Sequence, residues 1–179
     1  MECRELTFGA IEDYLRVPIA YEVQERLVVA DGCVEPVDPS WTKDYDLYGN
    51  TPRDYPKQFD VSKWGVLATY EGAEIIGGAI LAFRTPEFEL LEGRNDLAHV
   101  VDIRVAPKYR SSGVGRTLWR AAEDWARRRG AVEIRVETQD VNVPACRFYQ
   151  AMGCSLHAWD SGVYGPGMDE IQLIWGKPI

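Results

Sequence analysis

The segment from Val100 to Trp125 constrains the fold most strongly, because it reads as a strand, a glycine loop and a helix in immediate succession. The apolar, β-branched run 100–105 predicts a strand, which Ala106-Pro107 closes. The loop Arg110-Ser111-Ser112-Gly113-Val114-Gly115 follows. Beyond it, apolar residues recur at helical spacing, at Val114, Leu118, Ala121, Ala122 and Trp125. A loop that leads into a helix in this way turns several backbone N–H groups toward one point.

This loop favours phosphate binding, since the helix N-terminus adds a partial positive charge. Gly113 and Gly115 allow close approach of the backbone, and Arg110 and Arg116 can add charge-assisted contacts. The spacing excludes a P-loop, which ends in Gly-Lys-Ser/Thr, and a Rossmann fingerprint, which needs three glycines and a later acidic residue. An ordinary glycine-containing connection between a strand and a helix remains the alternative interpretation.

Length and composition indicate one soluble globular domain over residues 1–179. No apolar run approaches the roughly 20 residues that a membrane helix requires, and Met1–Glu5 lacks the apolar stretch of a signal peptide. The cysteines form no C-x-x-C pair, which favours buried thiols at Cys146 and Cys154 over metal ligands or a disulfide. We therefore expect a cytoplasmic protein without a bound metal and without a membrane partner.

The charge is unevenly distributed along the chain. The net charge of −8 argues against nucleic acid as a partner. Residues 104–135 nevertheless carry nine lysines and arginines against three acidic residues, so this segment is +6 and the remainder is −14. A basic patch around a phosphate loop in an acidic protein suggests an anionic cofactor and a cationic second ligand. A solvated helix face with basic residues near the helix C-terminus, at 127–129, is the alternative.

The N-terminal third has a less regular pattern. Residues 2–8 are compatible with a first strand, and 11–30 shows a helical pattern that Pro18 bends or splits. We expect 31–60 to be irregular but packed, and a candidate for ligand binding, because its prolines disfavour regular structure and its aromatic residues require burial. Within it, Trp41, Asp44, Tyr45 and Asp46 form a cluster that either cradles a cation or is a packed turn.

The rest of the chain alternates strands and helices. Residues 64–70 and 75–83 predict a β-hairpin, and 86–97 a loop. The helix after the glycine loop should end at Gly130, and 132–138 reads as a strand parallel to 100–105. Asn142, with Pro144 in the first turn, should cap a short helix that ends at Gly153. Two final strands, near 155–160 and 170–175, complete a mixed sheet in an α/β (α+β) fold.

Three elements in this order resemble the GNAT superfamily of acetyl-CoA-dependent N-acetyltransferases. They are Ile103-Arg104-Val105, Arg110-x-x-Gly113-x-Gly115 and Asn142-x-x-Ala145-x-x-Phe148-Tyr149-x-x-x-Gly153. The resemblance covers about 64–160, and the stretch 137–149 is also similar to streptothricin acetyltransferases. It implies a mostly antiparallel sheet of about six to seven strands, flanked by helices, with a central parallel pair that is splayed and often bulged.

The resemblance also implies a binding site for acetyl-CoA. Backbone groups of Ile103, Arg104 and Val105 would line the acetyl-pantetheine arm. The amides of the loop would hold the pyrophosphate, with Arg116 nearby, and these residues are Arg110, Ser111, Ser112, Gly113, Val114 and Gly115. The later helix would complete the site with Asn142 at the pantetheine, Tyr149 beside the thioester sulfur, and Ala145 and Phe148.

Acyl transfer to an amine needs a proton acceptor, a donor for the oxyanion and an acid for the leaving thiolate. Asp102 and Glu137 are candidate acceptors, and paired or solvated strand carboxylates are the alternative for each. The Val105 N–H is the candidate oxyanion donor. Tyr149 is the candidate acid, with a core aromatic as the alternative. His99 and His157 fit no ligand spacing and are expected to be structural.

We expect an enzyme that acetylates a primary amine of a small, cationic molecule such as an antibiotic or polyamine. A protein or peptide N-acetyltransferase with the same machinery is one alternative, and a non-catalytic acyl-CoA-binding module is another. The apolar run Leu173-Ile174-Trp175 either pairs across a homodimer or completes the core.

Overall fold

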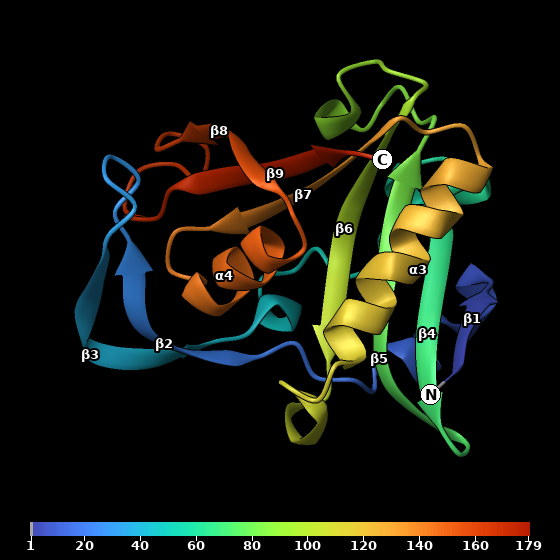
Figure 1. Ribbon diagram of the computed structural model, residues 1–179, viewed down its shortest axis with the longest axis horizontal. Helices are drawn as coiled ribbons and strands as arrows, with labels where there is room; N and C mark the ends of the chain where they lie inside the picture. Colours follow the sequence, from blue (N-terminus) through green and yellow to red (C-terminus); the bar gives the residue numbers. More distant parts are fainter. Residues whose placement is uncertain (1) are drawn as a thin grey trace. The chain divides into compact units, whose positions relative to one another are not determined.

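The computed structural model describes residues 2–179 and shows a mixed α/β fold (Figure 1). Seven strands form one sheet in the hydrogen-bonded order β1-β4-β5-β6-β7-β9-β8, and β2 and β3 form a separate two-stranded sheet. Helix α3 connects β6 to β7, and a crossover of this kind makes the two strands parallel. The chain divides into two compact units. The first contains the residues up to Ile19, 45–134 and 178–179, and the second contains 20–44 and 135–177.

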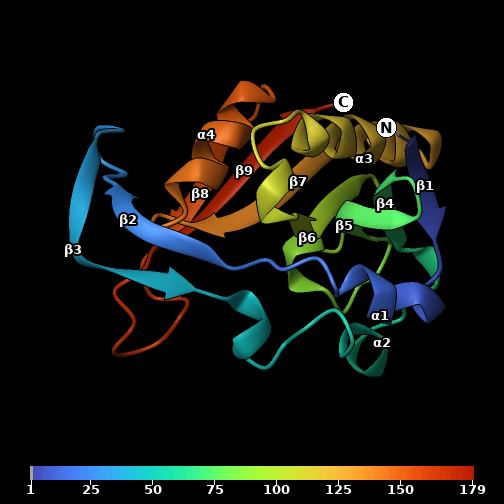
Figure 2. The same cartoon turned by 90° about the horizontal axis from the view of Figure 1, so that it is seen from below.

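The first unit is built on four antiparallel strands: β1 (Glu2–Leu6), β4 (Gly65–Glu71), β5 (Glu74–Phe83) and β6 (Leu97–Val105). Helix α3 (Val114–Arg128) packs on one face of these strands, and α1 (Ile11–Tyr14) and α2 (Tyr55–Gln58) lie at the other face (Figure 2). Short 3-10 turns occur at Phe8–Ala10, Tyr45–Leu47, Val61–Lys63, Glu89–Leu91 and Pro107–Tyr109.

Two consecutive glycines of β5 allow both faces to be covered closely. A Cβ atom on Gly77 would lie 2.9 Å from Val114 Cγ1 of α3, and one on Gly78 would lie 2.2 Å from Tyr14 Cε2 of α1. Because successive strand residues point to opposite faces, each glycine makes room for a different helix. The sheet is therefore covered on both sides at β5, the neighbour of β6.

Helix α3 forms where its apolar periodicity predicts it. Its buried face contains Leu118, Trp119 and Trp125. The helix ends as expected, because Gly130 follows with a φ of +88° and provides the left-handed conformation of a C-terminal cap. The Ala131 amide then bonds back to the Ala126 carbonyl at 3.0 Å.

The second unit contains the ribbon of β2 (Tyr21–Leu27) and β3 (Val34–Lys43), strand β8 (Ser155–Asp160), helix α4 (Val143–Ala151), and strand β9 (Gln172–Pro178) except for its last residue. Strand β7 (Glu133–Gln139) begins in the first unit and continues in the second. As predicted, the Asn142 side chain caps α4 by accepting a hydrogen bond from the Ala145 amide at 3.3 Å. Pro144 lies in the first turn, and Gly153 follows the helix with a φ of +85°.

The prediction of a helix over 11–30 is wrong beyond its first turn. Helix α1 ends at Tyr14, and residues 21–27 form β2. Pro18 interrupts helical hydrogen bonding, and pairing with β3 then satisfies the backbone of the following residues. The apolar spacing seen in the sequence therefore reflects strand pairing in this part of the chain.

The prediction of an irregular 31–60 segment is only partly right. Residues 34–43 form strand β3 in spite of two prolines, with a register shift between the pairs Val23–Trp41 and Glu25–Pro36, and the later part consists of short turns and α2. Tyr55 and Phe59 pack on Trp64, with ring centroids 5.6 and 5.7 Å away, but Trp41 and Tyr48 are exposed. Pro residues fit β3 because a two-stranded ribbon leaves one side of each strand without a ladder.

The remaining element predictions are confirmed. The hairpin is β4–β5, the first strand is β1, and the last strands are β8 and β9. In the β5–β6 pairing the register shifts between Ile80 and Leu81, which oppose Asp102 and Val100, so Val101 is an extra residue in β6. Residues 173–175 are buried, as expected of a segment that completes the core. Among residues 2–179, no helix is long and apolar enough to cross a membrane.

Candidate functional site

The glycine turn between β6 and α3 has the backbone conformation of an open, exposed loop. Gly113 has a φ of +96° and is the N-cap residue of α3, and Ser111 also has a positive φ of +61°. A Cβ atom built on Gly113 would meet no atom within 4 Å. The glycine is therefore needed for its conformation, and the space beside it is open.

Few amides of this turn are used in its own hydrogen bonds. In the described chain, those of Arg110, Ser112 and Thr117 donate to Pro107, Tyr109 and Gly113. The first N–H groups of a helix have no partner within the helix, so the amides at the start of α3 point outward. Arg110 and Arg116 are exposed beside them. The turn thus presents N–H donors, the positive end of a 15-residue helix and two guanidinium groups.

The backbone of β6 presents a second set of polar groups. Val105 opposes Gly77, and the next residue, Ala106, donates to the Ile76 carbonyl at 2.9 Å. Hydrogen-bonded and non-hydrogen-bonded pairs alternate in an antiparallel ladder, so the N–H and C=O of Val105 point away from β5, as do those of Ile103. The Val105 carbonyl accepts a hydrogen bond from Arg110 Nε at 3.1 Å.

Asp102 is engaged in a buried ion pair. Arg104 Nη2 lies 2.6 Å from Asp102 Oδ2, and Arg104 Nε lies 2.9 Å from Oδ1. The Tyr14 hydroxyl also donates to Oδ1, at 2.5 Å. Burial and the neighbouring Asp102 charge hold the pKa of Tyr14 well above its usual range, so the hydroxyl stays a donor. These contacts agree with the alternative interpretation of Asp102, in which it is a paired carboxylate on a strand and not a free proton acceptor.

The Arg104 guanidinium links three segments of the first unit. Its side chain is completely buried and, besides Asp102, bonds the Val17 carbonyl at 3.0 Å and both Asp46 oxygens at 3.0 and 3.1 Å. Burial lowers its pKa, but the hydrogen bond and charge of Asp102 outweigh this, so the net direction is upward. Asp46 belongs to the cluster for which the sequence left a cation site and a packed turn as alternatives, and its carboxylate binds a guanidinium of the protein itself.

The predicted basic patch around the glycine turn is therefore smaller than its sequence suggests. Arg104 is buried, and other members pair with acidic residues elsewhere in the first unit: Lys108 with Glu74, Arg127 with Asp124 and Arg129 with Glu5. The arginines at 127–129 lie in the last turn of α3 or just beyond it, where a positive charge complements the negative end of the helix dipole. This position supports the alternative explanation, in which they serve the helix and not a ligand.

Glu137 has a very different environment in the second unit. It is half-buried on β7, and Oε1 accepts a hydrogen bond from the Tyr164 hydroxyl at 2.7 Å. Tyr164 in turn accepts from Gln139 Nε2 at 2.7 Å. Within residues 2–179, no lysine or arginine forms an ion pair with Glu137, in contrast to Asp102. Tyr164 was not among the predicted site residues, because no sequence pattern links a loop residue to a strand residue 27 positions earlier.

The remaining predicted residues lie on α4. Tyr149 is buried, with an exposed fraction of 3%, and its ring lies 5.5 Å from that of Phe148 in an edge-on arrangement. Ala145 and Phe148 are half-buried, and Asn142 uses its side-chain oxygen for the cap. The fold thus gathers Glu137, Asn142 and α4 in the second unit, and Asp102–Val105 with the glycine turn in the first.

Other candidate groups have structural environments. Cys146 and Cys154 are buried free thiols, as predicted, and burial raises the pKa of Cys146 to about 12. His99 is buried beside Phe88. In residues 2–179 no group of three or more His, Cys, Asp or Glu residues could hold a metal ion. A depression of about 650 Å³ in the first unit, bordered by Lys63, Arg84 and Arg129, contains none of the predicted site residues.

Comparison with known proteins places this geometry in context. Residues 35–154 match the profile of the Acetyltransferase (GNAT) family. A streptothricin acetyltransferase from Streptomyces lavendulae is 32% identical over 130 residues, which cover 72% of this chain and 65% of that protein. The matched region thus spans just under two thirds of the length of this relative.

Two solved structures resemble the whole chain. A Bacillus anthracis protein assigned as a streptothricin acetyltransferase, crystallised with acetyl coenzyme A, is 28% identical with a TM-score of 0.80 over 99% of this chain and 98% of its own. A nourseothricin acetyltransferase is 26% identical with a TM-score of 0.76, over 99% and 97% of the two chains.

Proposed function

Because the chain belongs to the acetyltransferase (GNAT) family, we propose that it transfers an acetyl group from acetyl-CoA directly to a primary amine of a small, cationic molecule. The observation that carries this proposal is the glycine turn before α3. It combines outward-pointing amides, a helix N-terminus and open space at Gly113, which together suit a diphosphate. The similarity to a structure crystallised with acetyl coenzyme A agrees with this assignment.

Acetyl-CoA would be held mainly through the backbone. The amides from Arg110 to Gly115 bind the pyrophosphate, and Arg116 adds a charge-assisted contact. In the proposal, Ile103, Arg104 and Val105 line the acetyl-pantetheine arm, and support for this comes from the main-chain groups of Ile103 and Val105, which point away from β5. On α4, Asn142, Ala145 and Phe148 complete the contacts in the proposal. Acetyl-CoA supplies an activated thioester carbonyl.

Glu137, rather than Asp102, is the proposed acceptor for the amine proton. Both Asp102 oxygens already accept hydrogen bonds from Arg104, so this carboxylate is neutralised by a buried guanidinium. Within residues 2–179, the Glu137 carboxylate accepts its side-chain hydrogen bond from Tyr164, which is not a cationic residue. An alkylamine arrives protonated, and a carboxylate without a cationic partner can bind the ammonium and accept its proton, directly or through water.

Val105 and Tyr149 complete the proposed mechanism. The Val105 N–H stabilises the oxyanion of the tetrahedral intermediate, and such a donor contributes about 3–4 kcal/mol. Tyr149 then donates a proton to the departing sulfur, for which a phenol of ordinary pKa near 10 is suited. Its burial on α4 supports this assignment, since a water-excluded site strengthens electrostatic interactions.

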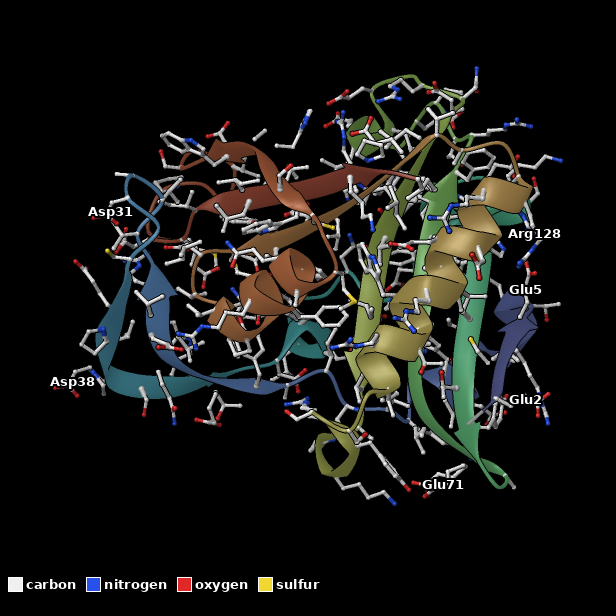
Figure 3. The ribbon with its side chains drawn as sticks, viewed as in Figure 1. Glu2, Glu5, Asp31, Asp38, Glu71 and Arg128 are labelled. Atoms are coloured by element: carbon white, nitrogen blue, oxygen red, sulfur yellow. The ribbon has the colours of Figure 1, made fainter. Side chains whose placement is uncertain are left out.

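The charge of the second unit supports a cationic amine. It contains 11 acidic residues against five lysines and arginines. Several of the acids are on the β2–β3 ribbon, where Asp31 and Asp38 project outward (Figure 3). A negative surface of this kind attracts cationic ligands. The streptothricin and nourseothricin acetyltransferases among the similar proteins make a cationic antibiotic the first substrate class to test.

The test is release of free CoA from acetyl-CoA in the presence of streptothricin, aminoglycosides, polyamines, amino acids and peptides. We expect release with a small polycationic amine and a product that is 42 Da heavier by mass spectrometry, as one acetyl group replaces one hydrogen. Release only with peptides would replace this proposal with a peptide acetyltransferase. Tight binding of acetyl-CoA without release for any amine would indicate a non-catalytic acyl-CoA-binding protein.

A further inference from the structure

The loop between β8 and β9 reaches the proposed acceptor carboxylate through one side chain. Residues 161–169 are exposed except for Tyr164, which is half-buried. The Tyr164 hydroxyl donates to Glu137 Oε1, and Gln139 Nε2 donates to the same hydroxyl, each at 2.7 Å. Glu137 and Gln139 lie two positions apart on β7, so their side chains lie on the same face of the strand.

The ends of this loop are held independently of Tyr164. At its start, the Gly162 amide bonds Asp160 Oδ1 at 2.7 Å. At its end, Arg26 of β2 bonds Asp169 Oδ2 at 2.9 Å, and Ile171 N bonds Asp140 Oδ1 at 2.9 Å. In the centre, the backbone hydrogen bonds from Gly165 to Gly162 and from Met168 to Gly165 are long, at 3.4 Å each. The Tyr164 contacts therefore fasten the centre of a loop whose ends are fixed.

We infer that Tyr164 is a positioning residue, which closes the 161–169 loop onto β7 and orients the Glu137 carboxylate toward the amine. The direction of the hydrogen bonds supports this role. The Gln139 amide donates to the tyrosine oxygen, which commits the hydroxyl proton to Glu137 Oε1. This fixes the rotamer of the carboxylate and leaves Oε2 to meet the ammonium. The inference rests on the proposed function in so far as Glu137 binds the amine.

The test compares Tyr164→Phe with Glu137→Gln and Tyr109→Phe. Tyr164→Phe removes the hydroxyl alone, whereas Glu137→Gln retains an acceptor oxygen for Tyr164 but loses the charge. Tyr109→Phe is the matched control, because Tyr109 also donates its hydroxyl to a glutamate, Glu71, at the exposed β4–β5 hairpin of the first unit. Hydrogen exchange of the 161–169 amides and steady-state kinetics with acetyl-CoA and the amine are the two readouts.

We expect faster exchange of the 161–169 amides in Tyr164→Phe, and wild-type protection in Glu137→Gln and Tyr109→Phe. In Tyr164→Phe, kcat/KM for the amine should fall about tenfold, the effect of one hydrogen bond to a charged group, while KM for acetyl-CoA is unchanged. Wild-type exchange in Tyr164→Phe would overturn the inference even if no amine proved to be a substrate. An active wild type with an impaired Glu137→Gln and an unaffected Tyr164→Phe would overturn it and leave the proposed function intact.

Discussion

The substitution Asp102→Asn separates the two carboxylates that the sequence offered as equivalent bases. Asp102 and Arg104 are buried, with exposed side-chain fractions of 6% and 0%, and Arg104 donates to both carboxylate oxygens. Removing one member of a buried ion pair costs about 3–5 kcal/mol, because the other charge stays buried. Asp46 still pairs with Arg104, and asparagine still offers an oxygen to Tyr14, so the loss should be at the lower end, about 3 kcal/mol.

This loss is large enough to measure by thermal unfolding. In a chain of this length, 1 kcal/mol shifts Tm by about 2–4 °C, so the Tm of Asp102→Asn should fall by about 6–12 °C. Urea unfolding should give the same free energy from the shift in midpoint at constant slope. Turnover per folded molecule at 25 °C should stay within about tenfold of the wild type, since Asp102 has no proposed role in proton transfer.

Glu137→Gln should change the stability little and the activity strongly. Glu137 is half-buried and has no ionic partner in the described chain, so the unfolding free energy of this variant should differ from the wild-type value by no more than about 0.5 kcal/mol. Its kcat/KM for the amine should fall about 10²–10⁴-fold, the contribution of a general base. Our reasoning is refuted if Asp102→Asn unfolds at the wild-type temperature and loses turnover more than a hundredfold.

Three further predictions follow from single residues. Tyr149→Phe should bind acetyl-CoA as the wild type does, but its kcat should fall about 10²-fold or more in a CoA-release assay; unchanged turnover would remove the hydroxyl from the mechanism. Gly113→Ala should weaken acetyl-CoA binding more than about tenfold by calorimetry, whereas Gly72→Ala, which also has a positive φ (+61°) and open space, should lose similar stability and bind normally. At pH 8 an aromatic disulfide reagent should label the exposed Cys33 in the folded protein. The same reagent should label Cys146 only after unfolding, because burial raises the pKa of this thiol to about 12.

Features that depend on neighbouring residues could be predicted from the sequence. The glycine turn, helix α3 with its end at Gly130, and the cap of α4 by Asn142 each depend on residues within a few positions of one another. The same applies to the β4–β5 hairpin, whose strands are joined by a short turn. Local conformational preference, capping and apolar periodicity decide these elements before any distant part of the chain is in place.

Features that depend on distant residues could not be predicted in this way. Val23 and Leu27 continue a helical apolar pattern, but their segment became a strand because β3 supplied hydrogen-bond partners. Arg104 appeared to belong to a basic patch until folding brought Asp46, 58 positions away, against its guanidinium.

The roles of the two candidate carboxylates at the proposed site could not be predicted from the sequence for the same reason. Asp102 and Glu137 have comparable places on strands in the sequence, and only folding gave Asp102 a buried cation and Glu137 a tyrosine. Backbone geometry is encoded locally, whereas the chemistry of a carboxylate depends on the charges and donors that chain closure brings within about 3 Å of it.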